Sequence, residues 1–129
     1  MTEEKQENLL LEDLPREIKA AVIAAQDKQA EEIQILELSA ITSFTDYFII
    51  MHGNSSKQLN ALSDWIERSL RKLQVKPLSI EGKKNAEWVL MDYGSFIIHI
   101  FTKGKRGFYA LERLWADVPK LDLPAEPEA

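Results

Sequence analysis

The apolar positions in the first part of the chain change from helical spacing to strand spacing. A helix is predicted over residues 14–30. Asp13 and Pro15 are residue types that favour the start of a helix. The apolar residues that follow them at helical intervals are Ile18, Val22 and Ala25. Residues 33–38 then alternate between two faces, which predicts a strand. Residues 45–52 are apolar on both faces, a pattern typical of a central strand that is covered on both sides.

A second helix and a hairpin follow this central strand. Gly53-Asn54 ends the strand, and Ser55 with Gln58 forms an S-x-x-Q capping box. The helix predicted over residues 55–74 carries an apolar stripe formed by Leu59, Leu62, Ile66 and Leu73. Further strands are predicted at 77–81, 87–92 and 96–102, and the short Gly-containing link at 93–95 makes the last two a hairpin.

The end of the chain predicts one more helix and then a tail. The last helix would carry Phe108, Leu111, Leu114 and Trp115. The element order then predicts an α/β fold, with a mixed five-stranded sheet packed by helices, in one domain over residues 13–118. Residues 1–12 are predicted to be a flexible lead-in, and the proline-rich, acidic residues 119–129 a flexible tail.

The amino-acid composition excludes some classes of function. The chain has 129 residues, a net charge of −5 and no cysteine, so thiol catalysis and Cys-ligated zinc are excluded. An acidic domain is a poor candidate for binding RNA directly. Its negative charge could attract a basic protein partner, or it could serve only to keep the domain soluble. The polar, acidic N-terminus resembles no targeting peptide, and no apolar run reaches membrane-spanning length, so a cytoplasmic protein is expected.

One enzymatic alternative is nucleotidyl transfer. Gly53-Asn54-Ser55, between a strand and a helix, could present N–H groups and a hydroxyl to a phosphate. That chemistry also needs paired carboxylates that hold magnesium, and the strands at 88–91 and 97–100 offer none. His52 and His99 have no acidic cluster to complete a metal site, and His99 in an apolar strand is more typical of a hydrogen-bonded core. No cofactor is expected.

The hairpin and the last helix hold the candidate binding residues. Alternation places Trp88, Leu90 and Asp92 on one face, and Val89, Met91 and Tyr93 on the other. The pattern leaves open whether Trp88 fills a core or anchors a partner on an exposed patch. The basic residues near Tyr109 are either a solvated face or a contact for an acidic or RNA surface; they are Lys103, Lys105, Arg106 and Arg113.

Four groups of short motifs follow one another along the chain. They are DKQAEEI at 27–33; TDYFII, GNS and Gln58 within 45–58; EG and EWVLMDYG within 81–94; and HIF, Arg106, FY, LE and LW within 99–115. Together they resemble the ribosomal silencing factor family, RsfS, also called iojap-like. Their order and spacing are specific, and the resemblance covers residues 9–118. Ser95 and Gly107 stand where members usually carry acidic residues, which puts in doubt only the local charge.

The resemblance implies a translational repressor without catalytic activity. Members of the family bind the large ribosomal subunit through ribosomal protein L-fourteen, block joining of the small subunit and lower translation when nutrients are scarce. It also implies a nucleotidyltransferase-like topology without catalytic carboxylates, a homodimer, no membrane and at most peripheral contact with ribosomal RNA. On this interpretation the expected partner-facing residues are Trp88, Leu90 and Asp92, with Tyr93 and Gly82 nearby and Arg106 and Tyr109 as second-rank candidates.

Overall fold

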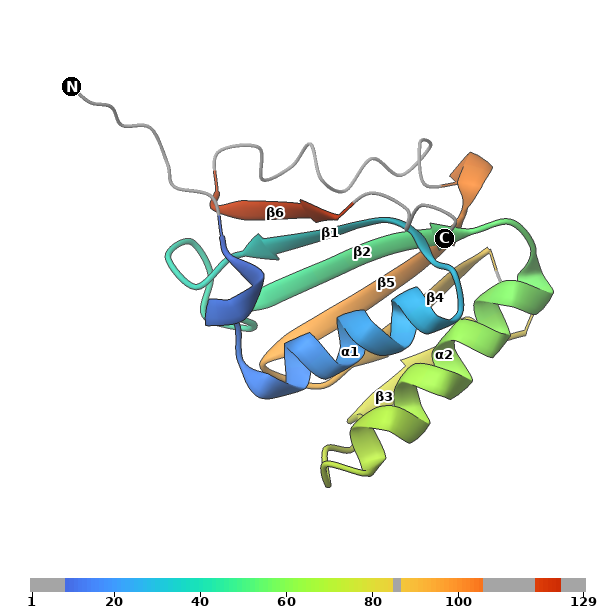
Figure 1. The fold of residues 1–129 in the computed structure, drawn as a ribbon, viewed down its shortest axis with the longest axis horizontal. Helices are drawn as coiled ribbons and strands as arrows, with labels where there is room; N and C mark the ends of the chain where they lie inside the picture. Colours follow the sequence, from blue (N-terminus) through green and yellow to red (C-terminus); the bar gives the residue numbers. More distant parts are fainter. Residues whose placement is uncertain (1–8, 85–86, 106–117, 124–129) are drawn as a thin grey trace.

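In the part of the chain that the structure describes, a mixed β-sheet carries the helices α1 and α2 on one face (Figure 1). The computed structural model describes residues 9–84, 87–105 and 118–123. Within them the sheet has six strands in the order β3-β4-β5-β2-β1-β6. Their bounds are β1 Glu31–Glu37, β2 Tyr47–Gly53, β3 Ser79–Glu81, β4 Trp88–Asp92, β5 Phe96–Thr102 and β6 Lys120–Leu123. β2 and β5 run parallel, and the other neighbours are antiparallel.

The helices cover one face of this sheet. α1 spans Arg16–Asp27 and α2 spans Ser56–Arg71, inside the predicted ranges. The predicted cap of α2 is confirmed, because the Ser55 hydroxyl accepts a hydrogen bond from the Gln58 backbone N–H at 3.1 Å. The apolar stripes of both helices pack on the inward positions of β2, β4 and β5 and form the main core. The helix predicted near Phe108 lies outside the described residues.

The prediction of a mixed α/β sheet is confirmed, but the count of five strands is wrong. The sixth strand, β6, lies in the segment predicted to be a flexible tail, and it pairs with β1 from Ile33–Leu123 to Leu36–Lys120. Leu121 and Leu123 pack against the main core. Four residues between prolines carry almost no pattern of their own, so this strand depends on a partner far away in sequence.

The predicted lead-in is also partly ordered. The Leu9 N–H donates to the Lys120 carbonyl at 3.0 Å, and a 3-10 helix spans Leu11–Asp13. Leu9 and Leu11 pack on the main core. The prediction of flexibility is therefore wrong for residues 9–12, because contact with β6 and the core outweighs their weak local preference; residues 1–8 lie outside the described part.

Candidate functional site

The two faces of the β4–β5 hairpin differ in exposure. Val89 and Met91 are fully buried under the helices, whereas Trp88, Leu90 and Asp92 are half-buried on the opposite face. Trp88 and Leu90 pack there against a second, smaller apolar cluster that includes Phe48, Ile97 and Phe101. We call this opposite face of the sheet the Trp88 side. α1 and α2 lie on the other face.

The indole of Trp88 is fixed in place by its strand neighbours. Its N–H donates a hydrogen bond to Nδ1 of His99 at 3.1 Å, and its ring stacks on Phe101 with centroids 5.2 Å apart. The β4–β5 register produces this arrangement, because Trp88 pairs with Phe101 and Leu90 pairs with His99. An aromatic side chain that is already ordered loses little conformational entropy on binding, so Trp88 suits the role of an interface anchor.

His99 serves as a hydrogen-bond acceptor inside the sheet. Phe48 contacts its ring edge-on at 4.5 Å, and burial lowers the pKa of the imidazole to about 4. The imidazole is therefore neutral at pH 7, and accepting at Nδ1 assigns its proton to Nε2. The prediction that His99 is a hydrogen-bonded core residue is confirmed.

Asp92 and Gly82 both shape the hairpin around Trp88. Oδ1 of Asp92 accepts the Gly94 N–H at 2.8 Å and so closes the turn between β4 and β5. Gly82 has φ of +90°, and a Cβ there would lie 2.1 Å from the carbonyl oxygen of Trp88. Only glycine permits this approach, so Gly82 supports the backbone of Trp88 rather than offering a side chain to a partner.

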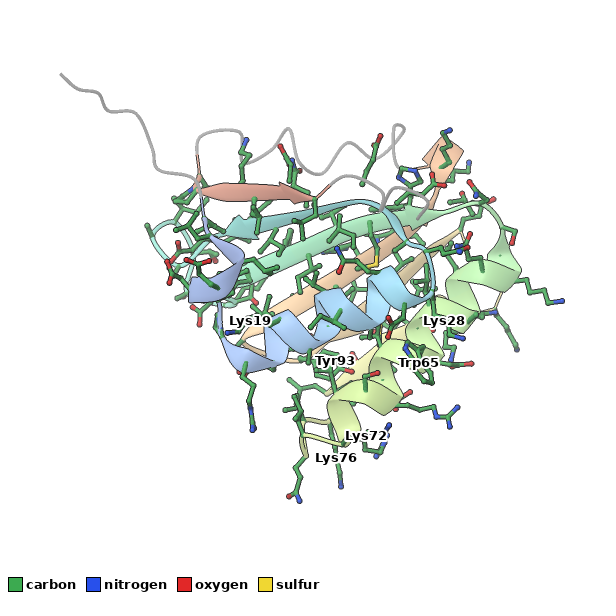
Figure 2. The ribbon with its side chains drawn as sticks, in the orientation of Figure 1. Lys19, Lys28, Trp65, Lys72, Lys76 and Tyr93 are labelled. Atoms are coloured by element: carbon green, nitrogen blue, oxygen red, sulfur yellow. The ribbon has the colours of Figure 1, made fainter. Side chains whose placement is uncertain are left out.

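Tyr93 lies apart from the other predicted site residues. It belongs to the helix-covered core, on the same side of the sheet as α1 and α2 (Figure 2). Its ring stacks on Phe96, with centroids 4.8 Å apart. Burial raises the pKa of its hydroxyl, and the charge of Glu67 adds to this effect. A partner on the Trp88 side would therefore not reach the Tyr93 side chain. Arg106 and Tyr109 lie outside the described residues.

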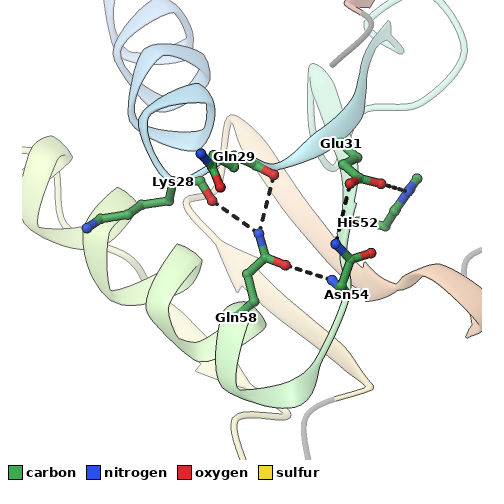
Figure 3. Close-up of polar contacts among 6 residues, drawn as sticks. All are labelled: Lys28, Gln29, Glu31, His52, Asn54 and Gln58. Carbon is green, nitrogen blue, oxygen red and sulfur yellow. Dashed lines mark hydrogen bonds and ion pairs between the residues drawn. The ribbon is translucent and has the colours of Figure 1, made fainter. Parts of the chain in front are cut away.

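At the strand–helix junction Gly53–Ser55, the alternative phosphate site, the side chain of Gln58 already occupies the Asn54 backbone N–H (Figure 3). Oε1 of Gln58 accepts the Asn54 N–H at 2.7 Å, and its amide nitrogen donates to the carbonyls of Lys28 and Gln29 at 3.2 and 3.3 Å. Gln58 thus ties the start of α2 to the turn after α1.

Sequence reasoning missed a polar cluster beside this junction. Glu31 pairs with His52 at 3.0 Å through one carboxylate oxygen and accepts the Asn54 side-chain amide at 3.4 Å through the other. These contacts join the 27–33 and 45–58 segments, which the sequence shows only as separate motifs. Among the described residues no group of three His, Asp or Glu side chains could hold a metal ion. None of the described helices is both long and apolar enough to cross a membrane.

Comparisons with known proteins give one consistent family. The family model described as "Ribosomal silencing factor during starvation" matches residues 11–129. The chain is 41% identical over 106 residues to the ribosomal silencing factor RsfS of Bacillus subtilis, covering 82% of this chain and 90% of that protein. A mouse protein named "Mitochondrial assembly of ribosomal large subunit protein 1" is 29% identical over 102 residues, covering 77% of this chain and 45% of that protein.

Solved structures show the same fold. A crystal structure of a protein from Chromobacterium violaceum superposes with a TM-score of 0.76 at 27% identity, covering 93% of this chain and 92% of that one. A crystal structure of a Bacillus halodurans protein gives a TM-score of 0.72 at 36% identity, covering 82% and 96%. The likeness therefore extends over nearly the whole chain.

Proposed function

The chain belongs to the ribosomal silencing factor family, and on that premise we propose that it represses translation by occupying the large ribosomal subunit. Its partner would be ribosomal protein L-fourteen, and the bound chain would block joining of the small subunit when nutrients are limiting. This action needs no catalytic step, because occupying a docking surface is sufficient. The name of the mouse relative, which mentions the ribosomal large subunit, supports the choice of subunit.

One observation carries the choice of surface. On β4, the half-buried Trp88 and Leu90 alternate with fully buried neighbours, and Trp88 is held in a single orientation by His99 and Phe101. A pre-ordered tryptophan beside an apolar side chain and a carboxylate is a typical interface anchor. Asp92 adds a negative charge at the edge of this patch, which suits a basic ribosomal protein.

The affinity of Trp88→Ala for purified large ribosomal subunits, compared with that of the wild type, tests the proposal. Truncation of an interface anchor costs about 2 kcal/mol or more, so affinity should fall at least about thirtyfold. Asp92→Asn keeps an oxygen for the Gly94 N–H and removes only the charge. We expect it to slow association, most visibly at low salt.

The control is Phe44→Ala, which truncates an exposed aromatic side chain in the β1–β2 loop. It should bind as the wild type does. Circular dichroism and urea unfolding identify variants that lose binding only because they unfold. If folded Trp88→Ala and Leu90→Lys both bind large subunits with unchanged affinity, the Trp88 side is not the docking surface.

A further inference from the structure

Charge is segregated between the layers of the fold. The whole chain has a net charge of −5, yet residues 16–28 and 55–76, which form the helices and their flanks, contain eight basic and four acidic residues. This layer is therefore net positive by four, and the rest of the chain is negative by nine. The positive layer lies on the face of the sheet opposite the Trp88 side.

Two of the four acidic residues in the helix layer form ion pairs. Glu67 pairs with Arg71 at 2.7 Å, and Asp64 pairs with Lys83, which adds a further cation beside α2. By contrast Lys57, Lys72 and Lys76 are exposed and form no ion pair within the described part of the chain. Lys57 even stands in the first turn of α2, where the helix dipole disfavours a cation, so helix stability does not explain it.

A half-buried tryptophan, Trp65, lies beside two further cations of this layer, Lys28 and Arg68. Nζ of Lys28 is 4.9 Å from the centroid of the Trp65 ring, and the Arg68 guanidinium carbon is 5.6 Å from it. Lys28 reaches over from the end of α1 to Trp65 on α2 (Figure 2). The Trp65 N–H is 3.5 Å from Asp27, which orients the indole. Lys72 and Lys76 continue the basic surface beyond the end of α2.

We propose that this helix layer is a second interaction surface, which binds the phosphate backbone and an unstacked base of single-stranded RNA. Cations spaced along two helices suit successive phosphates, and an aromatic ring among them is typical of surfaces that bind single strands. An acidic polypeptide would use the cations but would not need the indole. Because the sheet separates the two surfaces, RNA and the partner on the Trp88 side can bind together.

Fluorescence anisotropy with a labelled single-stranded RNA of about twelve nucleotides, at about 50 mM salt, tests the surface. Lys57→Gln/Lys72→Gln should weaken binding about tenfold, and the slope of log affinity against log salt should become shallower by about 1.4. The matched control, Lys103→Gln/Lys120→Gln, removes the same charge outside the helix layer and should bind like the wild type. Trp65→Leu keeps an apolar side chain and should lose about fivefold or more.

Three results would overturn the proposal. The first is no saturable binding of RNA by the wild type, and the second is equal weakening by the two double variants. The third is competition by polyglutamate as strong as by RNA, with Trp65→Leu unchanged, which would assign the surface to acidic protein segments. Trp88→Ala should leave RNA affinity unchanged. The RNA assay can therefore contradict this proposal without contradicting the proposed docking on the Trp88 side, because docking is measured separately with large ribosomal subunits.

Discussion

At the residue scale, the hydrogen bond between Trp88 and His99 links the candidate docking surface to the protonation of one imidazole. Nδ1 of His99 can accept the indole N–H only while the ring is neutral. Burial favours that neutral form by lowering the pKa to about 4 in the folded state, against an ordinary value near 6.5. The unfolded chain therefore binds a proton here at a higher pH than the folded chain does.

The protein should therefore lose stability as the pH falls below about 6.5. The contribution of His99 to the free energy of unfolding is complete above about pH 6.5 and is lost as the pH falls toward about 4. The shift corresponds to about 3 kcal/mol. In His99→Gln, which does not titrate, the unfolding free energy should fall less than in the wild type between pH 7 and pH 4.5. Urea unfolding at several pH values measures this, and parallel curves for the two proteins would contradict it.

At the scale of elements, β6 protects an edge of the sheet. It covers β1 from Ile33 to Leu36, and without it the backbone groups of β1 on that side would have no strand partner. Exposed edges of this kind pair readily with other chains. The Lys120 carbonyl of β6 also accepts a hydrogen bond from the Leu9 N–H, so β6 joins the start of the described chain to the sheet.

Removal of residues 119–129 should therefore destabilise the protein and promote its aggregation. The loss of Leu121 and Leu123 from the core should cost about 2 kcal/mol, since both are only partly buried. A shorter deletion of residues 124–129 keeps β6 and serves as the control. Thermal unfolding and light scattering compare the two, and equal stability of the two truncated proteins would show that β6 contributes little.

At the scale of the whole molecule, the sheet lies between the Trp88 side and the basic helix layer. The Trp88 side carries the half-buried Trp88 and Leu90, and the helix layer carries cations around Trp65. If the Trp88 side binds a partner as proposed, it also suits a second copy of the chain. The expected homodimer and the proposed ribosomal partner would then compete for Trp88.

We accordingly predict that self-association uses the Trp88 side. Leu90→Lys should shift the monomer–dimer equilibrium toward monomer, because it places a charge in a half-buried apolar patch. Light scattering over a range of concentrations measures the mass, and Phe44→Ala is again the control. If Leu90→Lys changes large-subunit binding but not the mass, the dimer forms elsewhere and does not compete.

Local sequence patterns predicted the structure correctly where the feature depends on one helix or one strand. Gln58 and Ser55 identified the cap of α2, and the alternation of β4 correctly separated Trp88 and Leu90 from Val89 and Met91. The motifs pointed to the family that the comparisons show. The prediction that Tyr93 lies near the Trp88 side is wrong, and the alternation along the hairpin already indicates the opposite face, where the structure places it.

The sequence by itself determined the periodicities, the caps, the absence of cysteine and the family, because each depends on neighbouring residues or on their order. Only the tertiary structure decided the contacts between distant segments. It paired Leu123 with Ile33 and placed His99 within hydrogen-bonding distance of Trp88. It also brought the Gln58 side chain to the Lys28 carbonyl and the Lys28 amine to the Trp65 ring. The physical reason is that side-chain spacing records which face a residue occupies, whereas strand pairing and helix packing decide what that face meets.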